Sequence, residues 1–212
     1  MRTLVIDTAT AACSVALIEG NCLIAGHHER VDRGHAERLI PMIGDLPQGG
    51  RCDRIMVDCG PGSFTGIRVG IAAARGLGLG WGVPVSGYSS LPLLAAAHFT
   101  GHPGHGPVVV VLEGGHGEVF VQGFAAGPFA PTSNLESLSP AAAIALLAGR
   151  TAIGSGTRFL AAIDPSLPLI DALPNAADLI SLPAAFTTLA ARPIYGRAPD
   201  ATPARPKAGI SA

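Results

Sequence analysis

The chain has 212 residues, which is enough for one large domain or for two lobes of about 100 residues each. Only 14% of the residues are charged and 48% are hydrophobic, whereas an average soluble protein has roughly 25% charged residues. This balance favours buried helix faces and an interface with another chain. The formal net charge is −1 and Lys207 is the only lysine. The sequence therefore lacks the basic tract of an independent nucleic-acid-binding protein, and we expect any RNA to be held mainly by a partner.

The sequence gives no sign of a membrane segment. No apolar run approaches the roughly 20 residues of a membrane span, and the first residues, Met1 to Asp7, are predicted to enter a strand at once. We therefore expect a cytoplasmic protein. The four cysteines have no CxxC spacing, which favours small buried side chains over paired metal ligands.

The beginning of the chain predicts strands followed by an amphipathic helix. Three successive strands are expected over residues 2–7, 13–19 and 22–30. The second and third are joined by a tight turn at Gly20-Asn21. From Gly34 the apolar spacing becomes that of a helix. Its apolar face consists of His35, Leu39, Met42, Ile43 and Leu46. A fourth strand is expected over residues 53–58.

The stretch from Gly60 to Trp81 predicts a turn, a cap at Ser63 and a helix rich in glycine. Glycine lowers helix stability by up to roughly 1 kcal/mol per interior site relative to alanine, so close packing has to offset this cost. Four small residues fall on one ridge of the helix: Gly66, Gly70, Ala74 and Gly78. We expect this ridge and the apolar face of the preceding helix to form one patch that pairs with another chain.

Two arginines of the same helix, Arg68 and Arg75, are seven residues apart and share a helix face. Two interpretations stay open. The arginines reach an anionic group or a phosphate on a partner, or they form a solvated edge with their aliphatic stems along the apolar surface.

The remaining chain predicts a third helix, a joint and a second lobe. A strand over residues 83–86 and a helix over 91–99 precede the joint at 100–107, which is rich in Gly, Pro and His. The second lobe is expected to repeat the pattern in shortened form. Its elements are strands over residues 108–112, 118–124 and 151–154 and helices over 140–148 and 176–191. We therefore expect lobes at 1–100 and 107–197 and a disordered tail at 198–212.

Several segments together resemble one protein family. They are Ile6-Asp7-Thr8-Ala9-Thr10, Arg33 to Met42, Gly60-Pro61-Gly62-Ser63-Phe64-Thr65-Gly66-Ile67-Arg68, Gly82-Val83-Pro84-Val85 and Pro193-Ile194-Tyr195. In these segments the chain is similar to the TsaB family, also called YeaZ, whose members are accessory subunits in the biosynthesis of threonylcarbamoyladenosine on bacterial tRNA. The similarity covers nearly the whole chain and is densest over residues 3–95.

The resemblance implies an α/β fold of the actin-like, sugar-kinase-like ATPase class, with two lobes that each have a β-β-β-α-β-α core and a shortened second lobe. It implies a non-catalytic scaffold, a pseudoenzyme that pairs with the catalytic paralogue TsaD, works with the ATPase TsaE and supports transfer to the tRNA adenosine next to the anticodon. It also implies a homodimer when TsaD is absent, contact with tRNA only through the complex, and no membrane. The family pairs through its first two helices. Here these carry His35, Leu39, Met42, Ile43, Arg68, Gly70, Ala74 and Arg75.

The residues argue against a catalytic centre. In actin-like ATPases the first hairpin holds phosphate and needs a Gly where this chain has Ala9, so Asp7, Thr8, Ala9 and Thr10 are interpreted as a degenerate phosphate hairpin. The catalytic relatives also carry two metal-binding histidines, which are absent from the segment Tyr88 to Leu94. The joint histidines His98, His102 and His105 are predicted to be solvated rather than zinc ligands. We expect no catalytic residue, no metal and no cofactor.

Two departures from the family pattern affect the second lobe. Members usually carry Asp-Ala-Arg-Arg before Glu-Val-Tyr, whereas this chain has a different sequence from Glu113 to Phe120, and Tyr195-Gly196-Arg197 replaces Tyr-Leu-Arg. The alternative function is a metal-dependent, peptidase-like hydrolase or an ATPase of the same superfamily. The missing hairpin Gly and the missing histidine pair argue against that alternative.

Overall fold

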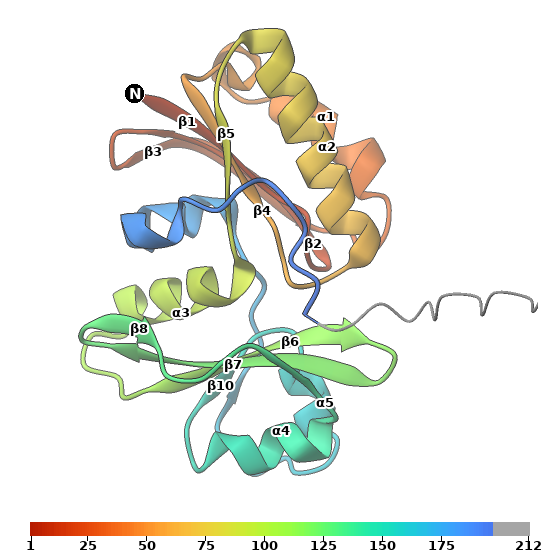
Figure 1. Ribbon diagram of the computed structural model, residues 1–212, viewed down its shortest axis with the longest axis vertical. Helices are drawn as coiled ribbons and strands as arrows, with labels where there is room; N and C mark the ends of the chain where they lie inside the picture. Colours follow the sequence, from red (N-terminus) through yellow and green to blue (C-terminus); the bar gives the residue numbers. More distant parts are fainter. Residues whose placement is uncertain (197–212) are drawn as a thin grey trace, which may run out of the picture.

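The computed structural model describes residues 1–196, which form two lobes that are each built on one β-sheet (Figure 1). The sequence-based prediction of a tail at 198–212 falls outside the described residues. Within residues 1–196, every helix is too short or too polar to cross a membrane.

The first lobe contains a five-stranded sheet in the order β3-β2-β1-β4-β5. Its strands are β1 (Arg2–Asp7), β2 (Ala12–Glu19), β3 (Cys22–Arg30), β4 (Arg54–Asp58) and β5 (Val85–Tyr88). β1 pairs antiparallel with β2, and the pairs β1–β4 and β4–β5 are parallel. The strands β1, β2 and β4 are buried on both faces, which explains why their sequences are nearly continuous apolar runs.

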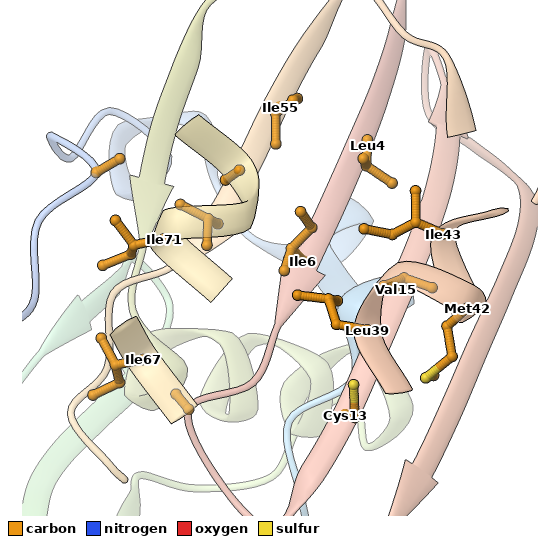
Figure 2. Close-up of a cluster of buried hydrophobic side chains, with 14 of the residues drawn as sticks. Leu4, Ile6, Cys13, Val15, Leu39, Met42, Ile43, Ile55, Ile67 and Ile71 are labelled. Atoms are coloured by element: carbon orange, nitrogen blue, oxygen red, sulfur yellow. The ribbon is translucent and has the colours of Figure 1, made fainter. Parts of the chain in front are cut away.

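Helices cover both faces of this sheet. On one face lie α1 (His35–Gly44), followed by the 3₁₀ turn η1 (Pro47–Gly50), and α2 (Phe64–Trp81). Figure 2 shows Leu39 of α1 and Ile67 of α2 directed into the same apolar cluster as Ile6 of β1. On the other face lie α3 (Ser90–Gly101) and the 3₁₀ helix η2 (Ala176–Ser181), packed on Val5, Ala16 and Met56.

The second lobe repeats this arrangement, and its elements after β7 are shorter than those of the first lobe. Its strands are β6 (Val108–Gly115), β7 (Glu118–Ala126), β8 (Phe129–Pro131), β9 (Glu136–Leu138), β10 (Ala152–Ile153) and β11 (Leu169–Ile170). The order is β11-β10-β6-β7-β8, with β9 also paired to β7, so the central antiparallel pair is again followed by parallel strands on one side. The helices are α4 (Pro140–Leu147) and α5 (Thr157–Ala161). The predicted fold class is confirmed: the two lobes have equivalent strand orders apart from the additional strand β9, and the helices of the second lobe are shorter.

The predicted helix over residues 176–191 is wrong. The segment forms η2, a break, and the short 3₁₀ helix η3 (Ala184–Phe186). The break falls at Leu182 and Pro183, which both have extended ψ angles, because the residue before a proline is disfavoured in the helical region and proline has no N–H to donate.

After η3 the chain runs as an extended strap, residues 187–196, back along the first lobe. Leu189 exchanges backbone hydrogen bonds with Gly87 of β5 at 2.7 and 3.1 Å, and Ile194 N–H donates to the carbonyl of Cys59 at 2.8 Å. Residues 176–196 therefore pack on the first lobe, although the sequence suggested that they belong to the second.

Candidate functional site

A cleft of about 840 Å³ lies between the two lobes. The first lobe contributes the β1–β2 hairpin at Ala9 to Ala11 and the start of α2 from Gly62 to Arg68. The second lobe contributes the β6–β7 hairpin at Glu113 to His116 and the start of α5, and the strap closes one end with Ile194 to Gly196. The cleft is thus the place where the duplicated halves meet.

The predicted phosphate hairpin is closed directly onto the first turn of α2. The N–H of Ser63 donates to the carbonyl of Ala9 at 2.7 Å, and the hydroxyl of Thr8 donates to the carbonyl of Gly66 at 2.7 Å. A Cβ on Gly62 would overlap the Ala9 carbonyl oxygen, and a Cβ on Gly66 would overlap the Thr8 carbonyl oxygen. Backbone atoms of the hairpin therefore fill the space next to the helix N-terminus, and the glycines are needed for this contact.

Two buried carboxyl groups lie beneath the hairpin. Asp7 and Asp58 end the neighbouring parallel strands β1 and β4, and both side chains are fully buried. Asp58 accepts from the N–H of Gly60 at 2.7 Å and from the hydroxyl of Ser90, and Asp7 accepts from the hydroxyl of Tyr88 at 3.3 Å. Burial raises the pKa of Asp58 well above its ordinary value, and the nearby Asp7 carboxylate raises this pKa further. Burial also raises the pKa of Asp7.

Sequence reasoning named Asp7 but missed Asp58, Tyr88 and Ser90. The sequence does contain a signal for this pair, because each of two apolar strands ends in an Asp. When such strands are parallel neighbours, both carboxyl groups lie at the same edge of the sheet, where the strands end. Neither carboxyl group lines the cleft, so the pair fastens the hairpin to the loop after β4 and does not face a ligand.

Six of the eight residues predicted for the pairing patch lie inside the first lobe. They are His35, Leu39, Met42, Ile43, Gly70 and Ala74. The His35 ring is within 2.9 Å of the Thr10 carbonyl, and Leu39, Met42 and Ile43 point toward the sheet (Figure 2). Gly70 faces Thr8 and Val57, so the glycine ridge lets α2 approach this chain's own sheet. These six residues are therefore buried within the first lobe and are not available to a partner.

The other two predicted residues, Arg68 and Arg75, are exposed and contact the strap. Arg68 Nη2 donates to the Tyr195 hydroxyl at 2.8 Å, and its guanidinium carbon lies 3.4 Å from the centre of the Phe64 ring. Arg75 Nη2 donates to the Ala191 carbonyl at 2.7 Å. The sequence could not show Tyr195 as a partner because it lies more than 100 residues from α2.

The opposite wall of the cleft carries the part of the second lobe that departs from the family pattern. Glu113 forms an ion pair with Arg158 at 2.5 Å. Asp32, which lies at the first-lobe rim of the cleft, pairs with Arg30 at 3.3 Å. Acidic and basic groups thus neutralise each other here, and this wall presents little net charge to a ligand.

The sequence suggested that the three joint histidines are solvated, but one of them is not. His98 is buried, its Nε2 lies 3.0 Å from Nδ1 of His105, and its ring stacks on His102 with 4.3 Å between centroids. Burial lowers the pKa of His98, and the two neighbouring histidines lower it further. Within residues 1–196, no group of three or more His, Cys, Asp or Glu side chains is arranged to hold a metal ion.

The chain is similar in sequence and in fold to several known proteins. The family model described as TsaD, tRNA N6-adenosine threonylcarbamoyltransferase, matches residues 27–127. TsaB of Escherichia coli (strain K12) is 38% identical over 125 residues, which cover 57% of this chain and 53% of that protein. An uncharacterised protein of Mycobacterium tuberculosis (strain H37Rv) is 32% identical over 94% of this chain and 93% of its own length. YeaZ from Pseudomonas aeruginosa superposes with a TM-score of 0.75 at 29% identity over 92% of this chain and 99% of that structure.

The chain belongs to the TsaB (YeaZ) family.

The YeaZ match extends over both lobes and therefore supports the predicted fold along nearly all of the chain. The TsaB sequences match less of it, because the chain spans about half the length of the curated TsaB proteins of E. coli, Haemophilus influenzae and Bacillus subtilis (53%, 52% and 47%). The match to the TsaD model includes α1, α2 and the loop between β4 and α2. The match to the TsaD model therefore includes the α2 part of the first-lobe wall of the cleft but not the β1–β2 hairpin.

Proposed function

We propose that this chain is an accessory subunit in tRNA threonylcarbamoyladenosine biosynthesis, which pairs with a TsaD-type transferase and takes no part in the chemistry itself. The family membership supports the pathway. The observation that carries the non-catalytic role is the closed hairpin, in which the Ala9 carbonyl accepts the Ser63 N–H at 2.7 Å. The proposal also places the chain in the cytoplasm, with TsaE as a further partner and tRNA reached through the complex.

The closed hairpin opposes phosphate binding for two reasons. The N-terminus of a helix attracts anions through its free N–H groups, but the hydroxyl of the N-cap residue Ser63 already accepts from the Gly66 N–H of α2, and the Ser63 N–H donates to the Ala9 carbonyl. The carbonyl oxygen at this place carries partial negative charge and would repel a phosphate. The acids Asp7 and Asp58 are buried beneath the hairpin and cannot hold a metal ion for a nucleotide in the cleft without a rearrangement.

The outer sides of α1 and α2 offer a pairing surface. On α1, Ile40 is 53% exposed, and on α2, Leu79 is 87% exposed. A Cβ on Gly76 or Gly80 would meet nothing within 4 Å, so another backbone can approach α2 closely there. We call the set Ala36, Ile40, Ala72, Gly76, Leu79 and Gly80 the pairing face. These residues lie opposite the buried ones that the sequence suggested.

The same face suits a second copy of this chain when TsaD is absent. A two-fold interface uses one patch twice, and a paralogue with the same fold presents equivalent helices to it. Exposed apolar side chains next to glycines with open space above them are typical of a surface that another helix pair covers. The proposal therefore includes a homodimer of the isolated chain.

Binding and turnover assays separate this role from that of a hydrolase. Light scattering of the chain alone, and of the chain mixed with its cognate TsaD, should show a homodimer and a heterodimer respectively. The purified chain should neither hydrolyse ATP nor cleave peptides, with or without added divalent metal, and should not bind ATP with sub-millimolar affinity. ATP turnover or peptide cleavage that disappears in Asp7→Asn would instead establish the alternative, an ATPase or a metal-dependent, peptidase-like hydrolase.

A further inference from the structure

Three exposed arginines lie along the edge where α2 meets the strap. Arg68 and Arg75 are seven residues apart, which is nearly two helical turns, so they project from the same side of α2 about 10 Å apart. Arg192 follows Ala191, the residue whose carbonyl accepts from Arg75. The Arg192 side chain is exposed and has no hydrogen bond or ion pair within residues 1–196. We call these three residues the arginine strip.

Within residues 1–196, none of the three arginines forms an ion pair with a carboxylate. The sequence contains no Asp or Glu between Asp58 and Glu113 or between Asp178 and Gly196, and these two segments include all of α2 and the strap. The nearest acids at the cleft, Glu113 and Asp32, are engaged by Arg158 and Arg30. Although the whole chain has a net charge of −1, this edge is cationic and complements a polyanion.

Two exposed aromatic rings lie at the cleft end of the strip. Phe64 is 57% exposed and Tyr195 is 51% exposed, with 5.9 Å between ring centroids and 32° between ring planes. The Arg68 guanidinium covers one face of Phe64 and is fixed by the Tyr195 hydroxyl. This hydrogen bond uses one of the several N–H donors of Arg68, and the others remain for a ligand. Alternating arginines and rings bind unpaired nucleic acid, because phosphates contact the cations and bases stack on the rings.

We propose that the arginine strip, with Phe64 and Tyr195, binds an unpaired segment of RNA. The choice of RNA among polyanions rests on the proposed function in tRNA modification. An unpaired segment fits better than a duplex, because bases within a duplex are stacked on each other and cannot reach the rings. Binding by this chain alone should be weak because of its net charge, so the strip acts when a partner holds the rest of the RNA.

The strip adjoins one side of the pairing face on α2. Around the α2 axis, Gly76 and Gly80 of the pairing face lie about 80–140° from Arg68 and Arg75, whereas Ala72 and Leu79 lie within about 60° of them. A TsaD-type subunit on the pairing face would therefore leave the strip at the edge of the interface, where RNA can reach both subunits.

The test uses the full chain bound to its cognate TsaD and an unmodified tRNA transcript as the probe. Binding is measured by fluorescence anisotropy at several KCl concentrations for the triple variant R68Q/R75Q/R192Q and for Arg192→Gln, which leaves the strap contacts intact. The matched control R2Q/R54Q/R150Q removes three arginines away from the strip, which contact Glu19, the Thr3 hydroxyl and the Leu146 carbonyl. Ultraviolet cross-linking and peptide mapping are done on the complex and on the chain alone.

The triple variant should bind tRNA at least tenfold more weakly, and the slope of log affinity against log salt should fall by about 2, since each phosphate contact on a single strand contributes about 0.7. Arg192→Gln should lower the slope by about 0.7, the control should stay within twofold of the unaltered chain, and cross-links should map to Phe64 and Tyr195. Unchanged binding and no cross-link at these rings in a folded, paired complex would overturn the inference. So would loss of protein binding with RNA binding retained, which would make the strip a protein contact. Failure of the unaltered chain to pair with TsaD counts against the proposed function instead.

Discussion

Thr8 and Ala9 present their carbonyl oxygens to the first turn of α2, and this contact decides which residues are tolerated opposite them. Gly62 and Gly66 have no room for a Cβ there, whereas Gly76 in the same helix has open space. The glycines of α2 therefore have two different roles. Some permit close packing inside the first lobe, and others leave the outer surface of the helix without side chains, so that another backbone can approach it.

Gly66→Ala should lower the free energy of unfolding by about 2–3 kcal/mol, because the new methyl group would overlap the Thr8 carbonyl and force the hairpin away from α2. Gly76→Ala is the matched control. It should raise the free energy of unfolding by about 0.5–1 kcal/mol, because alanine is the better helix former and meets no neighbour. Urea denaturation of both variants checks this pair, and equal effects would mean that the hairpin is not closed on the helix.

The buried pair Asp7 and Asp58 makes stability depend on pH. Both carboxyl groups have a pKa raised by burial, so the folded chain retains a proton that the unfolded chain releases above the ordinary carboxyl pKa of 3.8. The contribution of this pair to the free energy of unfolding is fully present when the pH is below 3.8. It is lost as the pH rises toward the folded-state pKa of Asp58. Asp58→Asn keeps a neutral hydrogen-bonding group at every pH.

We expect the free energy of unfolding to fall between pH 5 and pH 8 in the unaltered chain, and to fall less in Asp58→Asn, because this variant has no carboxyl group at position 58 to release a proton on unfolding. Asp45→Asn, which alters an exposed carboxylate, is the control and should follow the unaltered chain. Denaturation curves at the two pH values provide the measurement. The same pH dependence in all three proteins would show that the pair does not hold a shared proton.

At the scale of elements, α1 and α2 were predicted from periodicity and from the cap at Ser63, whose hydroxyl accepts from the Gly66 N–H at 3.2 Å. Periodicity could not predict which side of each helix faces this chain's own sheet and which side faces outward. A ridge of small residues fits a neighbouring sheet as well as a partner helix, and only the contacts of Gly70 with Thr8 and Val57 decide between them. Met42→Glu would therefore place a charge in the core, where Met42 is buried, and would test folding rather than pairing.

Gly76→Gln tests the pairing face without touching the core. The longer side chain projects into open space, so the fold should keep its stability, while close approach of another helix is blocked. We expect association with TsaD and self-association each to weaken at least tenfold, measured by light scattering and by titration calorimetry. Ala141→Gln on the exposed side of α4 is the control and should pair normally. Normal pairing of Gly76→Gln would place the interface elsewhere.

For the whole molecule, the sequence predicted two lobes of one repeated pattern, and the two sheets have equivalent strand orders. It did not predict that residues 176–196 return to the first lobe. The strap depends on contacts between residues far apart in sequence, such as Gly87 with Leu189 and Arg75 with Ala191, and such contacts leave no local periodicity. For the same reason the sequence showed neither the cleft wall formed by Ile194 and Tyr195 nor the arginine strip.

The closed hairpin and the exposed outer sides of α1 and α2 support the same proposal, in which the chain has no phosphate site and offers a surface to a catalytic paralogue. Threonylcarbamoyl transfer to a tRNA transcript, measured in a reconstituted system of the cognate TsaD and TsaE with and without this chain, tests this most directly. The account predicts transfer only when the chain is present, transfer that persists with Asp7→Asn if that variant is folded, and transfer that is lost with Gly76→Gln. Full transfer without the chain, or transfer abolished by Asp7→Asn in a folded and paired complex, would contradict it.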